Sequence, residues 1–210
     1  MKQAYRKDIK ALADACHRVA EFGLLRCSSG NMSCRLGKDL IAISASSCWL
    51  GDIKENQVAV CSLEDGRCIN DKKPSVESRF HLGILRQRSD VNTVLHFQSP
   101  FATAVACGKP EKYNFSILLE IPFYIGKPAV VKFLPPGSEA LANAVTKAAR
   151  KHDMIILCNH GLVTVGRDFN DVIAKACFFE LACQILLLQK NPQFLNKSAI
   201  ESLGKNIQRI

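Results

Sequence analysis

The chain has 210 residues, 48% of them hydrophobic and 22% charged, a composition that suits one globular α/β domain over residues 1–210. Its formal net charge is +9, but lysines and arginines are scattered among acids and form no basic run, so we expect a small anion as partner and no nucleic acid. The longest apolar runs are too short to cross a bilayer, so no membrane partner is expected.

The ten cysteines form no Cys-x-x-Cys pair and fall mostly in apolar segments, which is typical of buried, reduced thiols. The N-terminal residues begin basic, but Asp8, Asp14 and Glu21 interrupt them and no continuous apolar core of a signal peptide follows. We therefore expect a cytoplasmic protein.

The first part of the chain predicts a helix and then short strands. Apolar residues repeat at helical spacing up to Gly23, and later segments alternate or carry turn residues. The elements expected there are a helix at 3–22, a strand through Arg35, a strand at Leu40–Ser44, a hairpin over 57–69, and a helix at Ser75–Arg88 with Ser75 as its N-cap.

The rest of the chain alternates strands with helices and ends in a polar tail. Two prolines and a glycine at 135–137 mark the strongest break, and Ser138 after them is a good helix cap. The elements expected are a strand at Val91–Gln98, a helix at 100–107, extended segments at Ile117–Phe123 and Ala129–Leu134, a helix at 139–151, strands at Met154–Cys158 and Leu162–Val165, a helix at 168–190, and a C-terminal tail over 191–210.

The strand at Val91–Gln98 carries candidate metal ligands. Strand side chains alternate faces, so His96 and Gln98 would project from the same side of it. If His160, at the bend between two apolar runs, closes on this pair, three nitrogen and oxygen donors meet with positions left for a substrate. A lone histidine in a strand is more often structural, and that alternative stays open here.

Two polar turns and one acid complete the candidate chemistry. The turns at 27–33 and 44–47 offer small hydroxyls, an amide and a glycine that permits close approach, which a phosphate needs, although ordinary turns use the same residues. Glu77 lies in the first turn of an expected helix, where the helix dipole favours an acid whatever its role. A carboxylate, a metal and a phosphate cradle together form a recognised kind of active site.

The order of these segments resembles the class II aldolase family, over about residues 5–190. The segments that carry the resemblance are SSGN at 28–31, SASS at 44–47, KPSVE at 73–77, HFQ at 96–98, PPGSEAL at 135–141 and CNHGLV at 158–163. The resemblance implies a three-layer α/β/α sandwich around a mainly antiparallel sheet, in a homotetramer with active sites at subunit interfaces. It also implies the site residues: Glu77 as acid/base, His96, Gln98 and His160 as metal ligands, and a phosphate site of Ser28, Gly30, Asn31, Ser46, Ser47 and Ser75.

The activity implied by the resemblance is cleavage of a ketose 1-phosphate of the L-fuculose type to dihydroxyacetone phosphate and an aldehyde. A divalent ion, zinc in the family's aldolases, would stabilise an enediolate while Glu77 moves the proton. Three positions depart from the family pattern: Gln98 replaces a histidine, Phe133 a tyrosine, and Val76 a serine. An amide is a weaker zinc ligand than imidazole, so Mn²⁺ or Mg²⁺ are alternatives to Zn²⁺.

Two other functions remain open. A pentose-phosphate 4-epimerase of the ribulose 5-phosphate type would use the same metal and phosphate sites. A sugar-phosphate binding protein without metal or catalysis would explain Gln98 and Phe133. A decarboxylase or dehydratase on the same scaffold is a further alternative.

Overall fold

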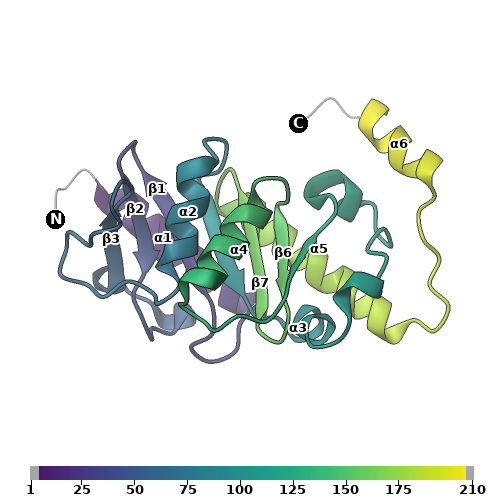
Figure 1. Cartoon of the computed structure of the whole chain (residues 1–210), viewed down its shortest axis with the longest axis horizontal. Helices are drawn as coiled ribbons and strands as arrows, with labels where there is room; N and C mark the ends of the chain where they lie inside the picture. The colour runs from purple at the N-terminus through teal and green to yellow at the C-terminus, as the bar shows by residue number, and fades with distance from the viewer. Residues whose placement is uncertain (1–4, 207–210) are drawn as a thin grey trace.

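The computed structural model describes residues 5–206, in which seven strands form one sheet (Figure 1). Its order is β3-β2-β1-β4-β7-β6-β5, and only β5 and β6 run parallel. The strands are β1 (Asn31–Leu36), β2 (Leu40–Ser44), β3 (Val58–Ser62), β4 (Thr93–Phe97), β5 (Ala129–Val131), β6 (Met154–Leu157) and β7 (Gly161–Gly166). The predicted mainly antiparallel sheet is confirmed.

Helices cover both faces of the sheet and form the outer layers of a three-layer sandwich (Figure 1). One face is covered by α1 (Arg6–Glu21), α3 (Pro100–Ala106) and α5 (Phe169–Leu188), and the other by α2 (Ser78–Gln87) and α4 (Glu139–Ala149). A last helix, α6 (Lys197–Asn206), lies in the segment predicted as a tail. Among residues 5–206, no helix combines the length and the apolar character that a membrane span requires.

Strand alternation divides the buried side chains between two cores. Along β4, Leu95 and Phe97 pack in the core beneath α1, α3 and α5, whereas Val94 packs in the core beneath α2 and α4. His96 has the parity of Val94, so it projects toward the α2/α4 side at the end of that core. The alternation therefore decides which helical layer surrounds the histidine.

Three predicted segments differ from the structure. The helix expected at Ser75 starts at Ser78. Pro74 pairs with Ala45 in an isolated bridge, and residues 76–77 form a turn before the helix begins. The segment expected to be extended over Ile117–Phe123 instead leads into a π-helix at Ile121–Ile125; a short apolar run does not distinguish strand from helix. The hairpin over 57–69 is reduced to β3 and one isolated bridge.

The outer edge of β3 is covered by the backbone of residues 67–69 and, beyond them, by the side chain of Asn70. Its Oδ1 accepts from the backbone N–H of Val60 at 3.0 Å, and its Nδ2 donates to the carbonyl of Val58 at 2.9 Å. The amide thus takes the place that a peptide group of an eighth strand would occupy.

Candidate active site

Glu77, His96 and His160 converge from three separate elements. Glu77 immediately precedes α2, His96 lies on β4, and His160 lies in the turn between β6 and β7. Their ligand atoms all lie within 4.8 Å of one another. Nε2 of His96 is 3.4 Å from Oε2 of Glu77, and Nε2 of His160 is 3.4 Å from Oε1 of Glu77. The convergence predicted for the two histidines is present, and Glu77 lies between them.

The tight turn between β6 and β7 brings His160 close because Gly161 has no side chain. A Cβ atom there would lie 2.8 Å from the carbonyl oxygen of Phe97, 2.8 Å from Cγ of Gln98 and 3.1 Å from Cε1 of His96. Asn159 supplies the left-handed conformation of the turn, with φ of 56°. Any other residue at 161 would push β7 away from β4.

The electrostatics of the three residues favour a cation between them. Nδ1 of His96 donates to the carbonyl of Leu162 at 2.9 Å, which leaves the lone pair of Nε2 directed at the Glu77 carboxylate. Burial, and secondly the proximity of His96, lowers the pKa of His160 and favours its neutral form. Two lone-pair acceptors facing each other repel unless a positive charge lies between them.

Two buried atoms of the cluster have no hydrogen-bond partner within the described part of the chain: Oε1 of Glu77 and Nδ1 of His160. A buried polar atom left unpaired costs about 1–3 kcal/mol, and a cation beside Oε1 of Glu77 would restore the interaction that this acceptor lacks. One carboxylate oxygen and two imidazole nitrogens are suitable ligands for a divalent transition metal. The donor set of this site therefore fits the metal that the sequence predicted.

The carboxylate of Glu77 is also held from the side of β1. Nδ2 of Asn31 donates to its Oε2 at 2.9 Å, and the other end of the same amide lies 2.5 Å from Nε2 of His81. Sequence reasoning assigned Asn31 to phosphate and did not single out His81. The four-residue spacing of Glu77 and His81, which places two polar groups one helical turn apart, was the signal available for it.

The predicted phosphate turns meet at the same end of the sheet as Glu77. The backbone N–H of Ser75 donates to the carbonyl of Ser44 at 3.2 Å, and that of Ser46 donates to the carbonyl of Lys73 at 2.9 Å. Ser28 and Ser47 are exposed, and Ser75 is buried. The segments that carry Ser46, Ser47 and Ser75 therefore lie side by side.

Two other predicted residues flank the histidines. Gly30 has φ of 82°, and a Cβ atom there would lie 2.7 Å from the carbonyl oxygen of His96, so only glycine fits. Gln98 is half-buried and follows β4, with its Cγ against Gly161. The turn that contains Gly30 thus lies against the backbone of His96.

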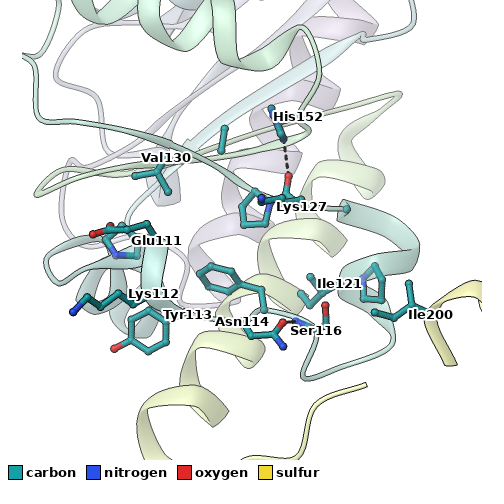
Figure 2. A pocket seen from close by; sticks show the side chains of 16 residues that line it. Glu111, Lys112, Tyr113, Asn114, Ser116, Ile121, Lys127, Val130, His152 and Ile200 are labelled. Atoms are coloured by element: carbon teal, nitrogen blue, oxygen red, sulfur yellow. Dashed lines mark hydrogen bonds between the residues drawn. The ribbon is translucent and has the colours of Figure 1, made fainter. Parts of the chain in front are cut away.

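A cavity of about 920 Å³ lies along the outer edge of β5 (Figure 2). Its lining includes Glu111, Lys112, Tyr113 and His152, and Nδ1 of His152 is paired with the carbonyl of Lys127 at 2.7 Å. None of the three converging residues lines this cavity, so it is separate from the candidate active site.

Comparison with known proteins identifies the family. Residues 10–187 match the family model described as "Class II Aldolase and Adducin N-terminal domain". The chain is 31% identical over 176 residues to an L-fuculose phosphate aldolase of Methanococcus maripaludis, covering 84% of this chain and 93% of that protein. It is 29% identical over 146 residues to a 3-oxo-tetronate 4-phosphate decarboxylase of Haemophilus influenzae, covering 68% of this chain and 69% of that protein.

A solved structure named L-fuculose 1-phosphate aldolase superposes with a TM-score of 0.84 at 22% identity, covering 94% of each chain, which establishes the shared fold. The match to the family model spans β1 to α5 and includes all three converging residues. The chain therefore belongs to the class II aldolase family, as its ordered motifs predicted, and is an enzyme of the lyase class.

Proposed function

We propose that the protein catalyses metal-dependent aldol cleavage of a ketose 1-phosphate of the L-fuculose type, giving dihydroxyacetone phosphate and an aldehyde. The observation that carries this proposal is the carboxylate of Glu77, which is 5% exposed and lies between two histidines with one oxygen unpaired. A buried carboxylate with a free oxygen is suited to carry a proton to and from carbon.

In the proposed reaction, a water molecule accepts the proton of the substrate hydroxyl as the carbon–carbon bond breaks. Glu77, carrying a proton on Oε1, delivers it to the carbon that becomes carbanionic and then regains a proton from solvent. His96 and His160, with Gln98 as a further ligand, would hold the divalent ion: zinc, or Mn²⁺ or Mg²⁺ in view of the amide. When bound, that ion supplies positive charge next to the negative charge that develops in the substrate.

The remaining site residues bind the substrate away from the bond that breaks. The phosphate group is assigned to Ser28, Gly30, Asn31, Ser46, Ser47 and Ser75. Because the side chain of Asn31 already contacts Glu77 and His81, we assign its phosphate contact to the backbone. Binding energy gained there would position the reactive carbons.

We also propose a cytoplasmic homotetramer with active sites at subunit interfaces. In support of this assembly, two large apolar side chains are exposed: Val76, next to Glu77 in the sequence, by 57%, and Phe133, just before the turn at 135–137, by 56%. Large exposed apolar side chains are typical of surfaces that another subunit covers. Light scattering during gel filtration would measure the mass; a monomer at micromolar concentration would contradict this assembly.

The test of the reaction is release of dihydroxyacetone phosphate from L-fuculose 1-phosphate and other ketose 1-phosphates. We expect product with a divalent ion, none after chelation, and recovery when the ion returns. Absence of product with every ion would contradict the proposal. In a parallel incubation, conversion of ribulose 5-phosphate to its epimer would identify an epimerase, whereas phosphate-dependent binding without stoichiometric metal would identify a non-catalytic protein.

Decarboxylation of a phosphorylated 3-oxo acid is the second candidate, and Phe133 favours it. Aldol cleavage needs one group to remove a hydroxyl proton and another to protonate carbon. Phe133, which replaces the family's tyrosine, cannot remove a proton. Loss of carbon dioxide needs only the protonation of carbon, which Glu77 could provide alone. Release of carbon dioxide from a 3-oxo-tetronate 4-phosphate, with no cleavage of ketose 1-phosphates, would establish this alternative.

A further inference from the structure

A chain of buried hydrogen bonds leads from β1 through α2 to the carboxylate of Glu77. Oγ of Ser33 lies 2.7 Å from Nδ1 of His81, and Nε2 of that ring lies 2.5 Å from Oδ1 of Asn31. Nδ2 of Asn31 then donates to Oε2 of Glu77 at 2.9 Å. We propose that His81 is a positioning residue: it fixes the orientation of the Asn31 amide and thereby leaves Oε1 of Glu77 as the free, reactive oxygen.

The direction of the chain follows from the Glu77 end. Oε2 of Glu77 accepts hydrogen bonds whether the carboxylate is ionised or carries its proton on Oε1, so Asn31 must turn its NH₂ group to Glu77 and its carbonyl oxygen to His81. A carbonyl oxygen also only accepts, so Nε2 of His81 must carry the proton. Each group therefore determines the orientation of the next.

The proton on Nε2 leaves Nδ1 of His81 as an acceptor. Burial, with a smaller contribution from His96, lowers the pKa of His81 to about 3, so the ring is neutral and holds one proton. Ser33 must then donate its hydroxyl proton to Nδ1. Ser33 thus selects the tautomer of His81 that Asn31 requires.

His81 is needed because an asparagine side chain is nearly symmetric in shape. Without a donor opposite Oδ1, the amide of Asn31 could turn over and present its oxygen to Glu77, where two acceptors would repel. Four residues of the network are buried, with exposures of 0% for Ser33 and His81, 6% for Asn31 and 5% for Glu77, so water cannot easily replace a lost partner.

The consequence is a difference between the two oxygens of Glu77. Oε2 accepts from Asn31, whereas Oε1 has no partner among the described residues. The terminal torsion of glutamate is broad, so the carboxylate would rotate if Asn31 did not hold it. The inference rests on the proposed function only in treating Glu77 as the reactive group.

The ring of His81 also packs on Phe80, at 4.7 Å between centroids and 19° between planes. A test must therefore separate positioning from packing, which two substitutions of similar size can do. His81→Gln keeps an N–H that can donate to Asn31, whereas His81→Leu has none.

We expect His81→Leu to lower kcat about 10- to 100-fold with little change in KM, because the substrate's phosphate contacts remain. His81→Gln should recover most of that loss. In a double-mutant cycle, His81→Leu combined with Asn31→Leu should be no worse than Asn31→Leu alone, since both act through one path. Equal losses in the Leu and Gln variants, or costs that add in the double variant, would overturn the proposal.

Two measurements need no turnover. Long-range ¹H–¹⁵N spectra should show His81 as the Nε2–H tautomer in the wild-type protein, and Ser33→Ala should shift it toward the Nδ1–H form. Cobalt or zinc affinity should fall about 10-fold or more in His81→Leu, because a turned Glu77 carboxylate no longer holds its negative charge beside His96 and His160. The affinity should stay near the wild-type value in His81→Gln.

These readouts distinguish the failure of each idea. If no sugar phosphate is cleaved but the tautomer and the metal affinities follow the prediction, the proposed function fails and the positioning role stands. If the wild-type ring is the Nδ1–H tautomer, the positioning role is wrong whatever the activity. Should His81→Leu not fold, Ser33→Ala and the tautomer decide the question.

Discussion

The hairpin of β6 and β7 carries a buried charged cluster at each end, and the two clusters differ in whether their atoms are paired. At one end, Nζ of Lys175 donates to Asp153 at 2.9 Å, to the carbonyl of Val165 at 3.0 Å and to Asp171 at 3.3 Å. At the other end, Oε1 of Glu77 and Nδ1 of His160 have no partner in the described structure. Burial alone does not identify a reactive site.

The two clusters differ in whether all their hydrogen-bonding groups are paired. The ammonium group of Lys175 has three N–H donors, and each has an acceptor, so no donor is left for a ligand. The Glu77 cluster instead presents lone pairs toward its own centre, an arrangement that favours a bound cation. The first cluster should therefore matter for stability, and the second for binding and turnover.

The largest expected effect is that of Glu77→Gln on turnover. Because an amide cannot carry the proton, kcat should fall about 10²–10⁴-fold, while the melting temperature stays the same or rises as a buried charge is removed. Steady-state kinetics and thermal unfolding would measure both. Full activity in the variant would remove Glu77 from the reaction.

Glu180→Gln is the matched control for that substitution. This carboxylate lies outside the site, where it accepts from the hydroxyl of Ser99 at 2.6 Å and from the backbone N–H groups of Phe101 and Ala102 at 2.9 and 2.8 Å. Its loss should lower stability and leave kcat unchanged.

Lys175→Met tests the saturated cluster. Removing one partner of a buried ion pair typically costs about 3–5 kcal/mol. The loss here should lie at the lower end of that range, because Asp153 and Asp171 are partly exposed and Asp153 keeps its ion pair with Arg88 at 3.1 Å. Urea unfolding would measure the loss, and kcat should remain at the wild-type value below the unfolding transition. A folded variant with low kcat would show that the two ends of the hairpin are coupled.

Metal addition should stabilise the protein through the unsaturated end alone. At a free metal concentration of 100 times Kd, binding raises the free energy of unfolding by about 2.7 kcal/mol. Thermal unfolding with and without chelator should show this rise in the wild-type protein and in Lys175→Met. The same rise in His96→Ala would place the metal elsewhere.

The smallest effect concerns acid stability and His81. The pKa of this histidine is about 3 in the folded chain against an ordinary 6.5, so below pH 6.5 the unfolded chain binds a proton that the folded chain does not. Its contribution is complete above pH 6.5 and is lost as the pH falls toward 3, by at most about 1.4 kcal/mol per pH unit.

Unfolding by urea at pH 7 and at pH 5 would measure this slope. His81→Gln has no such group, so it should lose less stability than the wild-type protein over the same interval. An equal loss in the two proteins would show that His81 is not held neutral.

Much of the fold followed from local patterns in the sequence. The Ser138 hydroxyl accepts from the backbone N–H of Leu141 at 3.1 Å, so the expected cap and the start of α4 are confirmed. The strands around His96 and His160 were likewise expected from their apolar runs and turn residues. These features depend on neighbours in sequence, which pattern reasoning can detect.

Two of the errors occurred where distant segments meet. The start of α2 was placed too early, and just before it Pro74 pairs with Ala45, a contact that no local pattern reports. His81 was missed for the same reason, since its partners Ser33 and Asn31 lie on a strand nearly fifty residues earlier. Recognising the role of His81 requires knowing that α2 packs against β1, which only the folded chain shows.

Asn70 has a consequence for how this protein behaves in concentrated solution. Sheet edges with free N–H and C=O groups recruit strands from other molecules, and this leads to aggregation. At β3, one amide occupies the backbone groups of Val58 and Val60 that an incoming strand would use. Replacing Asn70 with an aliphatic residue should therefore lower soluble yield and promote fibrillar association, even where the folded state loses little stability.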